Sequence, residues 1–144
     1  MRAAALLALL VLFAACAPSV YAPTVEGPSA TLRFTSPYLE DRFMSIDRLH
    51  LVVLSERCGG EILGRIPIDA PPSPVVAGRP LHLRLWMNTN EFMGPNQTNS
   101  VHFSFEPREN VDYHVVHIDN PGRMRFELDA GDDSPVEFVR GCSN

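Results

Sequence analysis

Lysine is missing from the 144 residues, cysteine occurs only three times and tryptophan once. All 12 basic residues are arginine, which we attribute to a G+C-rich coding sequence and not to a mechanism. The 17 acidic residues outnumber them and give a net charge of −5. An acidic chain is a poor partner for nucleic acid and for anionic lipid head groups, so we expect no nucleic-acid binding.

The sequence also lacks the motifs of common catalytic and calcium sites. It contains no Gly-x-Ser-x-Gly elbow, which hydrolases use to present a serine. Asp129, Asp132 and Asp133 lack the spacing of a calcium-binding loop and are typical of a solvated turn. We therefore expect a protein that is not an enzyme and that holds no cofactor.

One long apolar run is present, from Ala3 to Phe13, after the single charge of Arg2. Its length fits the ~7–15 residues of a secretory signal and falls short of the ~20 apolar residues that span a bilayer. The small residues Ala14 and Ala15 follow it. We therefore predict a signal peptide over residues 1–15, with cleavage of an ordinary soluble secretory signal near Ala17 as the alternative.

The residues Leu12-Phe13-Ala14-Ala15-Cys16 resemble the lipobox of bacterial lipoproteins. They depart from it at Phe13, where the pattern usually has leucine. The resemblance implies that the Cys16 thiol is acylated and that the chain is cut before it, which anchors the protein through lipid chains. Because residue 17 is alanine and not aspartate, the resemblance also implies, for a proteobacterial host, sorting to the outer membrane, on its periplasmic face.

Removal of the signal leaves a single-domain length from Cys16 to Asn144, with 11 arginines against 17 acidic residues and a net charge of −6. Residues 16–29 are rich in proline and predict a semi-extended tether that follows the lipidated cysteine. A disordered N-terminus without a spacing role is the alternative. We predict one folded domain over residues 30–144.

Apolar and polar residues alternate with the period of β-strands through this domain. The predicted strands cover residues 31–35, 47–54, 61–66, 81–86, 101–106, 111–116, 124–128 and 136–140. The run 47–54 is apolar on both faces, which predicts an interior strand. Residues 69–74 contain three prolines and predict a loop, and the polar stretch 88–99 predicts a long connection.

Seven or eight short strands with polar turns indicate an all-β, antiparallel β-sandwich, immunoglobulin-like or transthyretin-like, with a small β-barrel as the alternative. Over residues 30 to 142 the chain also resembles small envelope lipoproteins. The residues that carry this resemblance are Ala77-Gly78-Arg79-Pro80, Ser104-Phe105-Glu106-Pro107 and Asp112-Tyr113-His114-Val115. This resemblance implies no activity.

Three histidines, His82, His102 and His114, lie on the polar faces of three predicted strands. They can lie side by side if those strands are neighbours, which would form a metal or proton-sensing site. His117 cannot join His114 at one ion, because residues three apart on a strand face opposite sides. The alternative is that all are solvated surface histidines and that no metal is bound.

Cys58 and Cys142 are the two cysteines that remain after Cys16 is acylated. Each follows a predicted strand, and an exported protein meets an oxidising compartment. We therefore predict a disulfide between them, with two separate free thiols as the alternative.

Trp86, Phe92 and Met93 lie in or beside the polar stretch 88–99. An exposed apolar patch there would mark a partner site, whereas placement of Trp86 in the core is the alternative.

Taken together, the residues predict a lipid-anchored envelope protein that binds or supports another envelope component. The alternative function is a small metal-binding protein or hydrolase that uses the histidine face.

Overall fold

The computed structural model describes residues 18–37, 45–91, 97–118 and 124–142. Cys16, the predicted lipidation residue, lies outside this part of the chain, as do Phe92 and Met93 of the predicted partner patch. Nine strands and no helix are found within it. They are β1 (Ser29–Thr35), β2 (Ser45–Glu56), β3 (Gly59–Ile66), β4 (Ser73–Val76), β5 (Leu81–Glu91), β6 (Gln97–Phe105), β7 (Asp112–His117), β8 (Phe126–Ala130) and β9 (Phe138–Arg140).

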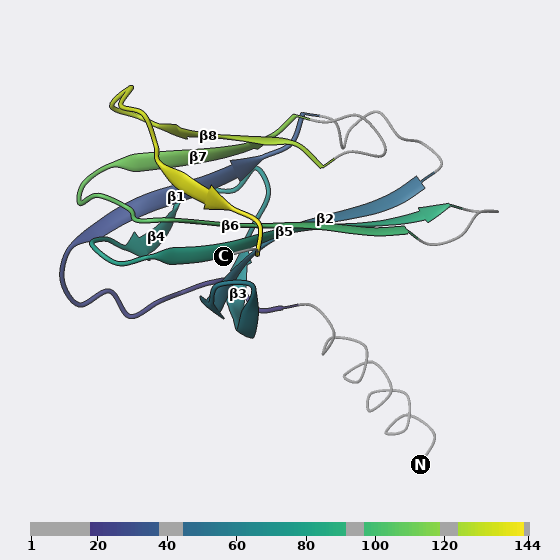
Figure 1. Cartoon of the computed structure of the whole chain (residues 1–144), viewed down its shortest axis with the longest axis horizontal. Helices are drawn as coiled ribbons and strands as arrows, with labels where there is room; N and C mark the ends of the chain where they lie inside the picture. The colour runs from purple at the N-terminus through teal and green to yellow at the C-terminus, as the bar shows by residue number, and fades with distance from the viewer. Residues whose placement is uncertain (1–17, 38–44, 92–96, 119–123, 143–144) are drawn as a thin grey trace, which may run out of the picture.

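The strands form two sheets that pack face to face (Figure 1). One sheet has the order β4-β1-β7-β8 and the other β3-β2-β5-β6-β9. All pairs are antiparallel except β1 with β7, which is parallel. The predicted sandwich is therefore confirmed, and the described strands do not close into a barrel. The described residues include no helix of the length and hydropathy that a membrane span needs.

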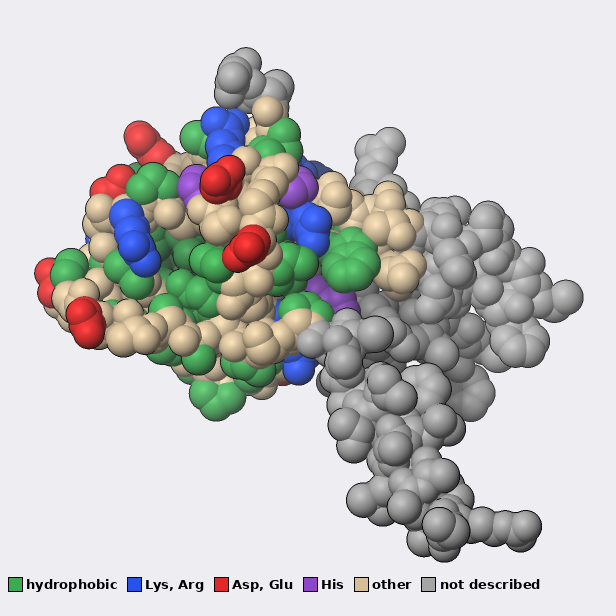
Figure 2. Space-filling view, turned by 90° about the horizontal axis from the view of Figure 1, so that it is seen from below, with side chains coloured by type: hydrophobic (Ala, Val, Ile, Leu, Met, Phe, Trp, Pro, Cys, Tyr) green, Lys and Arg blue, Asp and Glu red, His purple; other side chains and the backbone are tan. Residues whose placement is uncertain are grey.

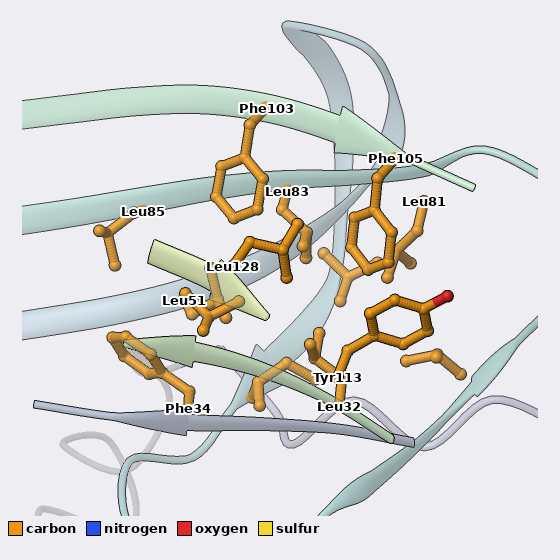
Figure 3. Packing of buried hydrophobic residues seen from close by; sticks show 14 of the residues in the cluster. Leu32, Phe34, Leu51, Leu81, Leu83, Leu85, Phe103, Phe105, Tyr113 and Leu128 are labelled. Atoms are coloured by element: carbon orange, nitrogen blue, oxygen red, sulfur yellow. The ribbon is translucent and has the colours of Figure 1, made fainter. Parts of the chain in front are cut away.

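The core lies between the sheets and follows from the period-two alternation of the strands (Figure 3). Leu32 and Phe34 of β1 face Leu51 of β2 and Leu83 of β5, and all four are almost completely buried. Phe103 of β6 stacks on Phe126 of β8, with ring centroids 4.2 Å apart. Burying each such side chain contributes about 1.5–3 kcal/mol relative to leaving it in water.

Two expectations about loops are wrong. Residues 73–76 form strand β4, although Pro74 lies within it. Proline is tolerated there because β4 is an edge strand, so no further strand needs its missing N–H. The long connection expected over 88–99 is mostly the ends of β5 and β6, which pair from Leu81↔Phe105 to Thr89↔Gln97.

The folded domain also begins earlier than expected. Ser19–Tyr21 pairs with β3: the Tyr21 N–H donates to the Arg65 carbonyl at 2.8 Å, and the Arg65 N–H donates to the Ser19 carbonyl at 2.8 Å. The Tyr21 side chain is buried in the core cluster. The predicted tether of residues 16–29 is therefore shortened, because its residues from Ser19 to Tyr21 belong to the sandwich.

Candidate functional site

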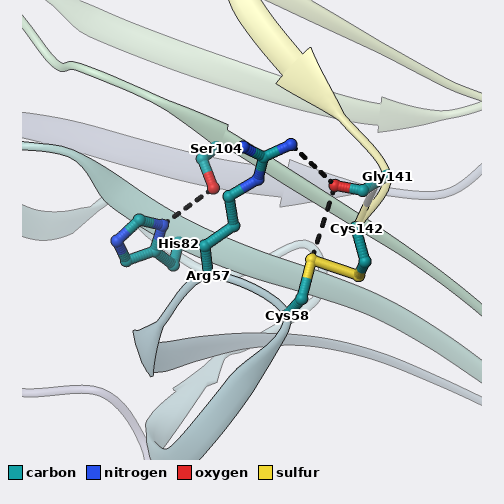
Figure 4. The surroundings of a disulfide bond; sticks show 6 residues. All are labelled: Arg57, Cys58, His82, Ser104, Gly141 and Cys142. Atoms are coloured by element: carbon teal, nitrogen blue, oxygen red, sulfur yellow. Dashed lines mark hydrogen bonds between the residues drawn. A yellow bond between two sulfur atoms is a disulfide. The ribbon is translucent and has the colours of Figure 1, made fainter. Parts of the chain in front are cut away.

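A disulfide joins Cys58, in the turn between β2 and β3, to Cys142, which follows β9 (Figure 4). The two Cα atoms are 5.5 Å apart, within the range that a disulfide requires. Gly141 continues the pairing of β9, because its N–H donates to the His102 carbonyl at 2.8 Å. The predicted bridge is confirmed, and it places the β2–β3 turn beside β6 and the end of β9.

A hollow of about 510 Å³ lies next to this bridge. Its lining residues come from the β2–β3 turn, the start of β5, the end of β6 and the region of β9. They are Arg57, Pro80, His82, Ser104, Phe105, Glu106, Glu137, Phe138 and Val139. Apolar side chains from β9 and charged groups of both signs therefore share one concave surface, which we define as the β9 hollow.

His82 and Ser104 form a hydrogen bond within the β9 hollow (Figure 4). They are cross-strand partners in β5 and β6, and the distance from His82 Nδ1 to Ser104 Oγ is 2.8 Å. A histidine bonded to a serine can activate a nucleophile. Ser104 is only 8% exposed, however, so its hydroxyl holds the imidazole in place and is poorly presented to a substrate.

Arg57 ties the same turn to the C-terminal segment. Its guanidinium Nη2 donates to the Gly141 carbonyl at 3.3 Å, and the Cys58 sulfur lies 3.4 Å from the same oxygen. This places a permanent positive charge beside the two sulfurs. A nearby cation stabilises a thiolate over a thiol whenever such a bridge is reduced.

His102 of β6 lies against the disulfide. One donor atom from each of Cys58, His102 and Cys142 lies within 4.8 Å of the others. His102 Nδ1 is buried and has no hydrogen-bond partner among the described residues. Burial, together with the positive charge of Arg84, lowers the pKa of His102 and favours the neutral imidazole. Two sulfurs and a neutral imidazole are donors that soft or borderline metal ions prefer.

His114 lies in the other sheet, so the three predicted histidines do not form one site. It projects from the outer face of β7, where its Nε2 is 2.7 Å from Thr35 Oγ1. Burial first, and then the charge of Arg33, lower the pKa of His114, while Asp129 opposes the shift. A second hollow of about 300 Å³ surrounds this histidine.

Trp86 is half-buried and faces away from the core, opposite in phase to Leu85. Its ring lies 5.5 Å from that of His50, and the guanidinium carbon of Arg84 is 5.7 Å from its centroid. The alternative of a core tryptophan is therefore wrong. Of the predicted partner patch the structure describes only Trp86, because Phe92 and Met93 lie outside the described residues.

The acidic turn is held by local hydrogen bonds. Asp132 Oδ1 accepts from the Ser134 hydroxyl at 2.6 Å and from Arg108 Nη2 at 3.1 Å. Hydrogen bonds from Ser134 and Arg108 lower the pKa of Asp132. Asp132 and Asp133 are exposed in the turn, as the sequence predicts, whereas Asp129 lies in β8 and pairs with His114.

Sequence reasoning missed Arg57, Phe138 and Val139 as parts of a site. Phe138 and Val139 are visible as apolar residues of a predicted strand, but nothing in the sequence shows that this strand pairs with β6. A scan of protein-family models, a search of curated proteins and a search of solved structures each return no match for this chain. The fold and the site define a disulfide-bonded, two-sheet β-sandwich with a hollow at its bridge.

Proposed function

We propose that this chain is a lipid-anchored protein of the bacterial outer membrane, on its periplasmic face, with a binding or structural role that is not enzymatic. The observation that supports it best is the disulfide between Cys58 and Cys142. Structural disulfides persist in exported proteins because the compartment outside the cytoplasm oxidises thiols. The signal peptide and the acylated Cys16 predicted from the sequence require the same compartment.

The β9 hollow is the binding surface in this proposal. Phe138 and Val139 are exposed large apolar side chains, 38% and 51% accessible. They adjoin Arg57 and Glu137 in one concavity of about 510 Å³. An apolar anchor with charged residues around it is the arrangement by which protein partners are held. Another envelope protein is the partner that such a lipid-anchored domain meets.

The anchor is tested with the variant Cys16→Ser. We expect wild-type protein to sediment with membranes and to carry diacylglycerol on an N-terminal Cys16, as measured by mass spectrometry of the mature chain. The variant should be unprocessed or soluble. A mature wild-type chain that starts at another residue without lipid would overturn the proposal.

The partner surface is tested with Val139→Asp, which places a charge in the β9 hollow. After chemical cross-linking in intact envelopes, we expect the variant to lose a cross-linked envelope protein that the wild type retains. Glu127→Arg is the matched control, because Glu127 is exposed on β8 in the other sheet. Equal cross-linking of the wild type and Val139→Asp would contradict this role.

The cluster of Cys58, His102 and Cys142 supports metal binding as a second candidate function. The sulfurs are closed to a metal while they are bonded to each other. An external dithiol that reduces the bridge passes it two electrons and two protons, and becomes a disulfide itself. The two thiols release their protons to solvent when a metal binds, and the resulting thiolates form a three-ligand set with the imidazole, which Zn²⁺ completes with water and which Cu⁺ accepts without a further ligand.

Zinc titration of the protein in excess dithiol, followed by competition with a coloured chelator, tests this candidate. We expect one Zn²⁺ per reduced chain and none in the oxidised chain. His102→Asn should weaken binding by more than ~100-fold, since even a second-shell partner of a ligand is worth ~10–100-fold. His82→Asn is the matched control on the neighbouring strand. Equal binding by the two variants would contradict the assignment.

A further inference from the structure

Three exposed apolar side chains lie where the N-terminal segment joins the sandwich. Val20 is 49% accessible, and Ile62 and Leu63 of β3 are 43% and 47% accessible. Val20 forms a parallel bridge with Arg65, two residues beyond Leu63 on the same strand. Leu63 also lines one hollow with Tyr21. Among the described residues they are three of the five exposed large apolar side chains, and we define them as the β3 patch.

The N-terminal segment packs tightly against β3. Gly64 has a φ of +152°, and a Cβ there would lie 2.6 Å from the Tyr21 Cα and 2.7 Å from its N. The two backbones can approach this closely only because residue 64 is glycine. With two hydrogen bonds of 2.8 Å on Arg65, the segment Ser19–Tyr21 is held on β3. The chain therefore reaches the surface of the sandwich beside the β3 patch and not at an arbitrary place.

Only three peptide steps separate Cys16 from Ser19. Even when it is fully extended, such a segment spans at most ~11 Å. A lipid on Cys16 would therefore hold the β3 side of the sandwich within about that distance of the head groups. Figure 1 shows that the described chain begins beside β3, and Figure 2, seen from below, shows hydrophobic side chains exposed among polar and charged ones.

We infer that the β3 patch rests on the lipid bilayer to which Cys16 attaches the chain, so that the β3 edge of the sandwich faces the membrane. This inference rests on the proposed lipid anchor. Acyl chains supply the affinity, and the patch sets the orientation, because tethering makes even weak apolar contacts with the bilayer effectively intramolecular.

The test places a tryptophan in the patch of the lipidated full-length mature protein. Leu63→Trp is made in a Trp86→Phe background and reconstituted into phosphatidylcholine vesicles that contain brominated acyl chains. Bromine quenches only a fluorophore that reaches the bilayer. The matched control is Glu127→Trp in the same background, because Glu127 is exposed on β8, on the opposite side of the molecule in Figure 1.

We expect Leu63→Trp to lose at least half of its emission in brominated vesicles and to shift to shorter wavelength, while Glu127→Trp changes by less than a tenth. Two results would overturn the membrane-facing patch while supporting the anchor. In both, the lipidated protein floats with the vesicles; in the first there is no quenching at position 63, and in the second quenching is equal at positions 63 and 127. Protein that carries no lipid and does not float overturns the anchor, and the orientation with it. Melting curves of both variants verify that the sandwich is folded.

Discussion

Gly64 and Tyr21 lie in direct backbone contact, although they are 43 positions apart in the sequence. A side chain at position 64 would have to occupy the space of the Tyr21 Cα. This contact joins the segment before the first strand of the fold to β3. It explains why a proline-rich stretch that reads as a free tether becomes part of the sandwich.

Gly64→Ala should destabilise the protein by about 1–3 kcal/mol, the usual cost of forcing extra volume into a packed site. Gly59→Ala is the control, because a Cβ there meets nothing within 4 Å. It should change the free energy of unfolding by less than about 0.5 kcal/mol. Urea unfolding of the two variants decides the matter, and equal midpoints would show that Tyr21 can move away without cost.

Removal of the disulfide should lower stability substantially. The bridge spans 84 residues, and closing a loop of this length restricts the unfolded chain by roughly 4–5 kcal/mol in the entropic account. The double variant Cys58→Ser, Cys142→Ser should therefore melt on the order of 10–20 °C below the wild type. Thiol titration of unfolded, unreduced Cys16→Ser protein should find no free thiol, and two per chain would rule out the bridge.

His114 should make stability depend on pH. Its pKa is lowered in the folded chain by burial and by Arg33, with Asp129 opposing, so the fold favours the neutral ring. As the pH falls below about 6.5, the ordinary pKa of histidine, the unfolded chain takes up the proton first. The free energy of unfolding should therefore fall with pH until the pH passes the folded pKa, below which this loss is complete.

The variant His114→Asn isolates this contribution, because asparagine can still bond Thr35 and does not titrate in this range. Chemical denaturation at pH 7.5 and pH 5.0 should show a smaller stability loss in the variant than in the wild type. An identical loss in both proteins would mean that His114 does not contribute.

Tyr113→Phe should cost about 0.5–1.5 kcal/mol, the net worth of one hydrogen bond. The Tyr113 hydroxyl accepts from the Arg108 N–H at 2.9 Å, and the residue is 2% exposed. Phenylalanine keeps the ring that packs 4.8 Å from Phe105. Tyr113→Leu, which also alters the packing, should cost more. Thermal unfolding that is unchanged in Tyr113→Phe would show that water replaces the hydroxyl.

The strands themselves could be predicted, because a half-buried strand alternates apolar and polar residues. The run 47–54 departs from this alternation because it is apolar on both faces, and it lies between β3 and β5 as the interior strand that such a run predicts. Val52 and Leu54 point away from the core cluster yet are almost fully buried. The disulfide could also be predicted, since the predicted acylation of Cys16 left two of the three cysteines to pair.

The arrangement of the strands could not be predicted. Apolar and polar residues alternate in the same way in the strands of both sheets. This pattern therefore does not reveal that His82 and His102 share one sheet while His114 belongs to the other. Pro74 was misleading because the rule against proline in strands does not hold at an edge. The β9 hollow depends on pairing between β6 and β9, which is a tertiary contact without a local signal.

The parallel pairing of β1 with β7 constrains how the molecule can fold. β1 is an interior strand of its sheet, and its partners lie at Ser73–Val76 and Asp112–His117. The first strand to emerge during synthesis therefore has no parallel neighbour until most of the chain exists. Contacts of such sequence separation form slowly. If the chain is exported as proposed, it should therefore stay unfolded during passage through the export channel and acquire its sandwich only after its second half has crossed.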